Sequence, residues 1–67
     1  MSFMIKRTTG EPGKEVVRYY VRMTGFGQMF QTMDIARRYD TYEEAEAVIE
    51  EDDLRDLAGE IEIIEVD

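Results

Sequence analysis

The four residues Thr41 to Glu44, TYEE, mark a point at which the chain is expected to begin a helix. A Thr at the helix N-cap and a Glu three residues later can each satisfy one backbone amide that the first turn leaves without a partner. We therefore expect the helix to begin at Tyr42. Its apolar residues share one side, and its carboxylates fill the opposite arc. The apolar residues are Ala45, Val48 and Ile49.

The predicted helix ends near Asp52 or Asp53. Leu54 and Leu57 fall off its apolar side, so a short second turn is needed to bring both leucines inward. Gly59 fits the end of that turn.

The residues on either side of the helix favour strands. Residues 3–8 are apolar at their start, residues 17–23 alternate in polarity, residues 28–35 tolerate a strand, and residues 60–66 read EIEIIEV. GEPGK (residues 10–14) and TGFG (residues 24–27) supply the turns between the first three. The alternation predicts that Arg18, Tyr20 and Arg22 point to one face of the sheet.

This order of elements predicts a single α+β domain over residues 1–67. The first three strands form an antiparallel meander, and the amphipathic acidic helix covers one face of the sheet. We expect the helix to return the chain so that the fourth strand lies parallel to the first, in the order 3-2-1-4. The opposite face, with Arg18, Tyr20, Arg22 and Lys6, is expected to stay open.

A chain of 67 residues without Cys has a thin core and no disulfide to support it. A homodimer or a partner would add stability. The start MSFMIKRTTG has only a short apolar patch, far below the span of about 20 residues that crosses a membrane. We therefore expect a cytoplasmic protein with no membrane segment.

Charge is divided unequally along the chain, whose net charge is −8. Residues 1–38 hold seven bases and three acids, whereas residues 39–67 hold one base, Arg55, and thirteen acids. Such a division indicates either internal neutralisation or two faces of opposite sign that meet partners.

The residue types argue against an enzyme and against a bound metal. The sequence has no His and no Cys, which are the commonest general base and the best nucleophile, and Ser2 is its only serine. The acidic run EEDDLRD (residues 50–56) lacks the alternation and the Gly position of a calcium loop. We therefore expect neither a cofactor nor a metal.

The acidic helix is the strongest candidate for a binding surface. Helices usually mix Lys and Glu at a spacing of four, but here Glu46 and Glu50 form a like-charge pair, which is mildly destabilising. The excess charge predicts docking on a basic surface of a partner protein, such as a surface that normally holds a nucleic acid. The residues expected to make this contact are Glu43, Glu46, Glu50, Glu51, Asp52 and Asp53.

Two alternatives stay open. Arg18, Tyr20 and Arg22 could form a nucleic-acid-binding row on the open sheet face, because cations interleaved with aromatic rings bind single strands; the net charge of −8 disfavours direct nucleic-acid binding. Alternatively, the charge serves only solubility, or it neutralises the basic half of the chain in a structural homo-oligomer.

The run ARRYDTYEEAEAVIE (residues 36–50), with a Tyr-rich hairpin before it and EIEIIEV after it, resembles small uncharacterised proteins of phage and prophage genomes. No activity is defined for that group, so the resemblance transfers no site residue. By its size, its acidity and its lack of catalytic residues, the chain is also similar to phage anti-defence proteins such as anti-CRISPRs, several of which imitate nucleic acid. This second resemblance implies an inhibitor that acts in the host-cell cytoplasm.

Overall fold

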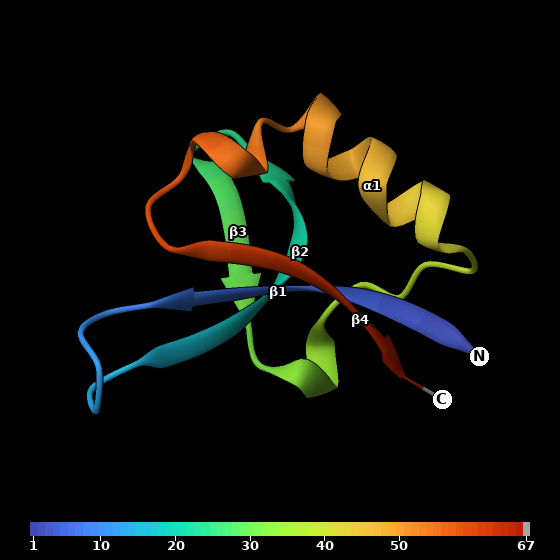
Figure 1. The fold of residues 1–67 in the computed structure, drawn as a ribbon. Helices are drawn as coiled ribbons and strands as arrows, with labels where there is room; N and C mark the ends of the chain where they lie inside the picture. Colours follow the sequence, from blue (N-terminus) through green and yellow to red (C-terminus); the bar gives the residue numbers. More distant parts are fainter. Residues whose placement is uncertain (67) are drawn as a thin grey trace.

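We describe residues 1–66 of the protein from a computed structural model, shown in Figure 1. One four-stranded sheet is covered on one face by a single α-helix. The elements in chain order are β1 (Ser2–Thr9), β2 (Val16–Thr24), β3 (Gly27–Gln31), the 3-10 turn η1 (Met33–Ile35), α1 (Tyr42–Glu51), the 3-10 turn η2 (Leu54–Asp56) and β4 (Glu60–Val66).

The strand order β3-β2-β1-β4 and the α+β class confirm the predicted arrangement, but the predicted direction of β4 is wrong. β4 runs antiparallel to β1, with Ser2 opposite Val66 and Thr8 opposite Glu60. Figure 1 accordingly shows the beginning of β1 and the end of β4 on the same side of the molecule.

The segment between β3 and α1 explains the direction of β4. The backbones of Phe3 and Tyr39 exchange two hydrogen bonds of 2.8 Å, so the chain has already returned to the beginning of β1 before the helix starts. α1 and η2 then carry it toward the end of β1, where Gly59 lies against Thr8. β4 can only run back from there. The sequence pattern predicts that the helix returns the chain, whereas residues 32–41 do so.

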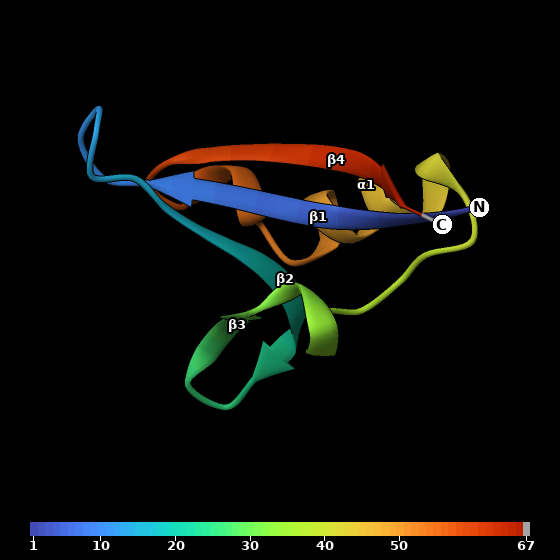
Figure 2. The same cartoon turned by 90° about the horizontal axis from the view of Figure 1, so that it is seen from below.

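The same segment separates the hairpin β2–β3 from the rest of the sheet. The register of β1 and β2 runs from Thr9–Val16 to Lys6–Tyr19. Beyond it, the backbone amide of Arg37 donates to the carbonyl oxygen of Tyr20 at 3.1 Å. Residues 37–39 thus lie between the two strands, and Figure 2 shows the hairpin turned away from β1 and β4.

A β-bulge at Val21 changes the direction of the side chains on β2. Tyr20 lies opposite Phe30 and Arg22 lies opposite Met29, so Val21 has no partner on β3. Because neighbouring residues of a strand point to opposite faces, Tyr20 and Arg22 lie on opposite faces of the sheet. The predicted row of Arg18, Tyr20 and Arg22 on one open face is therefore wrong.

The core lies between α1 and the sheet. Its buried residues come from five parts of the chain: Ile5, Tyr20, Tyr39, Ala45, Ile49 and Leu54. Met4 is also fully buried, and because it neighbours Ile5 on β1 it points to the opposite face of the sheet. Tyr20, which we expected on the open face, is 0% exposed in this core.

Both ends of α1 agree with the sequence pattern. The Thr41 side chain accepts a hydrogen bond from the backbone amide of Glu44 at 3.1 Å, which confirms the N-cap. The Glu44 carboxylate accepts from the backbone amide of Asp40 at 3.4 Å, one residue before the cap. At the other end, Asp53 adopts a left-handed conformation with φ of 54°, and Leu54 turns into the core.

The third strand is shorter than predicted. It ends at Gln31, and Met33–Ile35 form the turn η1. The Thr32 hydroxyl hydrogen-bonds the Asp34 carboxylate. A local side-chain bond of this kind competes with strand pairing, which explains why residues 32–35 leave the sheet.

Candidate protein-binding surface

The exposed carboxylates of α1 form a continuous line along the helix. Glu43, Glu46 and Glu50 are all exposed. At 3.6 residues per turn, they fall within about 60° of one another, on the side of the helix away from Ala45 and Ile49. We call these three residues the acidic stripe. It extends about 10 Å along the helix axis, at a rise of 1.5 Å per residue.

Glu51 and Asp53 extend the negative charge to the C-terminal end of α1. Both side chains are exposed, and the last turn of the helix contains no basic residue. Carboxylates at this end oppose the helix dipole, which favours cations there. The fold itself therefore gains nothing from this charge.

A shallow hollow lies between the end of α1 and η2. Its volume is about 270 Å³. Its lining combines one apolar side chain with three carboxylates and one guanidinium: Ile49, Glu50, Asp53, Arg55 and Asp56. The hollow joins the acidic stripe at Glu50 and adds Asp56, which we did not predict as a contact residue. Its position three residues after Asp53, across the break of the helix, is the only signal in the sequence that links it to the surface.

Asp52 belongs to the fold rather than to the exposed surface. The Tyr20 hydroxyl donates a hydrogen bond to its carboxylate, and the Gln28 side-chain amide donates to its backbone oxygen at 2.8 Å. Burial raises the pKa of Tyr20, and the hydrogen bond and negative charge of Asp52 raise that pKa further. Asp52 thus fixes α1 to the hairpin β2–β3, and of the six predicted contact residues it is the one that the structure separates from the others.

The basic side chains of the N-terminal half do not neutralise the acidic stripe. Within residues 1–66, the ion pair below 4.0 Å joins Lys6 and Glu62 at 3.6 Å. These residues face each other on β1 and β4.

Several arginines make other contacts within the fold. The Arg7 guanidinium lies 5.1 Å from the centre of the Phe30 ring and donates to the Ala58 carbonyl at 2.9 Å. The Arg37 guanidinium lies 4.9 Å from the centre of the Tyr39 ring. Arg18 donates to the Val17 carbonyl at 2.8 Å. These contacts hold the arginines near β1, β2 and residues 37–39, and none of them involves a residue of the acidic stripe.

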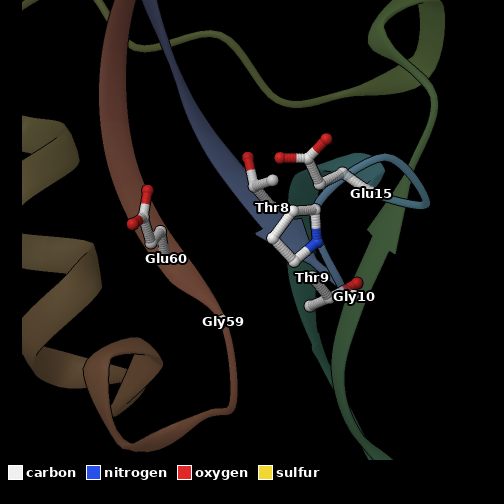
Figure 3. Close-up of a pocket in the computed structure, with 7 residues that line it drawn as sticks. Thr8, Thr9, Gly10, Glu15, Gly59 and Glu60 are labelled. Carbon is white, nitrogen blue, oxygen red and sulfur yellow. The ribbon is translucent and has the colours of Figure 1, made fainter.

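A second hollow, of about 350 Å³, lies where the β1–β2 turn meets the start of β4. Figure 3 shows its two carboxylates, Glu15 and Glu60, projecting from opposite sides with Thr8 between them. Within residues 1–66, no group of three or more Asp or Glu side chains is arranged to hold a metal ion. This hollow therefore offers two separate carboxylates and two Thr hydroxyls, without a convergent set of ligands.

Comparisons of the chain with protein-family models, with curated proteins and with solved structures gave no match in any of the three. Among residues 1–66, no helix has the length and apolar character needed to cross a membrane. The resemblance to phage proteins therefore stays a prediction from the sequence.

Proposed function

We propose that this is a non-enzymatic binding protein that docks its acidic surface on a basic surface of a partner protein. The observation that carries this proposal is the acidic stripe: Glu43, Glu46 and Glu50 are exposed on one side of α1, and no cation of residues 1–66 lies within 4.0 Å of them. Like charges at this spacing destabilise a helix slightly. A partner that supplies cations removes that cost.

The hollow beside Glu50 supports a more specific contact. Glu50, Asp53 and Asp56 line it and offer carboxylates for the charged head of a Lys or Arg side chain. Arg55 already lies in the hollow, so an incoming cation competes with it for these carboxylates. One inserted side chain would fix the position of the partner, while the stripe attracts its other cations at longer range.

The partner in this proposal is a protein whose basic surface normally holds a nucleic acid. Carboxylates in a line can occupy a Lys- and Arg-lined channel in place of phosphates, and the net charge of −8 accelerates the encounter. An inhibitor of the phage anti-defence type acts in this way. The nucleic-acid-binding alternative loses its support, because Tyr20 is 0% exposed and its ring has no free face on which a base could stack.

Two variants of equal net charge test the proposal. Glu46→Lys/Glu50→Lys reverses two charges of the stripe, and Glu11→Lys/Glu15→Lys reverses two exposed carboxylates near the β1–β2 turn. Both variants and the wild type serve as baits in host lysate at low and at raised salt. Captured proteins are identified by mass spectrometry, purified, and titrated with each bait in the presence and absence of DNA.

We expect the wild type and the Glu11→Lys/Glu15→Lys variant to capture a basic protein. Raised salt and DNA should each release it. The Glu46→Lys/Glu50→Lys variant should not capture it. If the two variants lose binding equally, only net charge matters and the stripe has no specific role. If no bait captures a protein, the charge serves solubility and the proposal fails.

A further inference from the structure

The strand β3 and the residues next to it in the chain differ from the rest of the sequence because they carry no charge. The whole run from residue 23 to residue 33, MTGFGQMFQTM, has no Asp, Glu, Lys or Arg, although 36% of the chain is charged. β3 lies within this run and is an outermost strand of the sheet. The outer edge of such a strand presents backbone amides and carbonyls that make no hydrogen bonds to another strand. Proteins usually protect such edges with charged residues or proline.

Large apolar side chains are exposed around the same strand. Four of the seven exposed large hydrophobic residues within residues 1–66 lie between positions 23 and 35. They are Met23 (42% exposed), Phe26 (105%), Met33 (43%) and Ile35 (54%). Met23 and Phe26 lie near the beginning of β3 and Met33 and Ile35 lie beyond its end, so both ends of this edge strand carry exposed apolar side chains, which are common at protein interfaces.

The tip of the hairpin is held rigid. The Thr24 hydroxyl donates to the carbonyl oxygen of Gly27 at 2.8 Å and accepts from the backbone amide of Phe26 at 3.1 Å. Gly27 has a φ of 115°, a conformation that other residues rarely adopt. The hairpin also turns away from the body of the protein (Figure 2), and the Phe26 side chain is fully exposed. The ordered backbone of the turn reduces the entropy that binding has to remove.

From these observations we propose that β3 pairs antiparallel with β3 of a second copy of the chain, across a two-fold axis near Met29. The sheet then continues through both copies as eight strands. In this pairing Gln28 of one copy lies opposite Phe30 of the other, and the exposed apolar residues of the two hairpins flank the axis.

Charge decides which edge of the sheet two copies of the chain can share. Two molecules of net charge −8 repel each other, so they can meet only where the surface is uncharged. The other outer strand, β4, exposes Glu60, Glu62 and Glu65, which would oppose one another in a self-pairing. On the β3 side, Arg22 lies one strand inward, opposite Met29. The two copies of Arg22 are then three strand spacings apart, about 14 Å, which exceeds the screening length at physiological salt.

Sedimentation velocity of the full chain tests this pairing, at concentrations from about 10 µM to about 1 mM. Phe26→Asp removes the apolar anchor from a fully exposed position, and Val16→Asp adds the same charge at the far end of β2, where Val16 is 45% exposed. Amide hydrogen exchange on the wild type at low and high concentration reports on the edge of β3 itself.

The wild type should form a dimer that persists or tightens as salt rises, because its contact is apolar and the repulsion is screened. Phe26→Asp should raise the dimer dissociation constant at least about tenfold, while Val16→Asp leaves it within about threefold. Amides of residues 28–31 should become more protected at high concentration. A wild type that stays monomeric overturns the proposal. So does a dimer that salt dissociates or that both variants weaken equally.

Discussion

The hydrogen bond from the Tyr20 hydroxyl to the Asp52 carboxylate gives the sharpest prediction about the fold. It joins the hairpin β2–β3 to the end of α1, and Tyr20 is fully buried. Tyr20→Phe keeps the ring in the core but leaves the carboxylate without its donor. Asp52→Ala removes the carboxylate and keeps the backbone oxygen that accepts from Gln28.

The size of the effect follows from the burial of the two groups. Hydrogen bonds to a charged group contribute about 1.5–3 kcal/mol. Because Asp52 is only half-buried, water replaces part of the lost bond, and we expect about 1.5 kcal/mol for Tyr20→Phe. A domain of this length has a total stability of about 3–10 kcal/mol, so the loss lowers the melting temperature by roughly 6–12 °C.

Urea unfolding followed by circular dichroism measures this effect in a double-mutant cycle. The two single variants and their combination should give a coupling energy of about 1–2 kcal/mol. Glu51→Ala is the matched control, because Glu51 is the exposed neighbour of Asp52. A coupling below about 0.3 kcal/mol, or an equal loss in the control, would refute the assignment of Asp52 to the fold.

Three further predictions concern buried groups and turns. Tyr39 is buried, and its hydroxyl has no hydrogen-bond partner among residues 1–66. Tyr39→Phe should therefore leave the free energy of unfolding, measured by urea titration, unchanged or raise it by up to about 1 kcal/mol. A decrease of about 1 kcal/mol would contradict this prediction. Burial raises the pKa of both Tyr20 and Tyr39, so the native state keeps protons that the unfolded state releases, and stability should fall as pH rises above about 10. A tyrosine that stays protonated in the native state contributes a slope of about 1.4 kcal/mol per pH unit. Thermal melts across this pH range check the slope, which should be shallower in Tyr39→Phe than in the wild type. Gly59 has a φ of 96°, and a Cβ there would lie 2.4 Å from the carbonyl oxygen of Thr8, so Gly59→Ala should cost more than about 1 kcal/mol, whereas Gly25→Ala meets no atom within 4 Å and should cost less than about 0.5 kcal/mol. Equal melting temperatures for these two variants would show that Gly59 does not lie this close to β1.

The features that the sequence predicts well are local. The N-cap of α1 needs only Thr41 and Glu44, which are three residues apart, and the break at Asp53 follows from the position of Leu54. Strand order also follows, because two short turns join the first three strands and leave few positions for the fourth.

The features that the sequence does not predict depend on contacts between distant residues. The direction of β4 is set by the pairing of Phe3 with Tyr39, which no periodicity reveals. The burial of Tyr20 depends on where β2 leaves β1. Asp52 is different, since its position about 20° from Ala45 on the helix already places it on the buried side. Its charge alone groups it with the exposed carboxylates in the sequence.

The central claim is that the position of the acidic stripe, and not the net charge, makes this a binding protein. The most direct measurement is the dissociation constant of the captured partner for three proteins at one salt concentration: the wild type, Glu46→Lys/Glu50→Lys and Glu11→Lys/Glu15→Lys. Our account predicts a loss of about 100-fold for the first variant, because two close charge pairs become repulsive, and less than about threefold for the second. Equal losses in the two variants would contradict it.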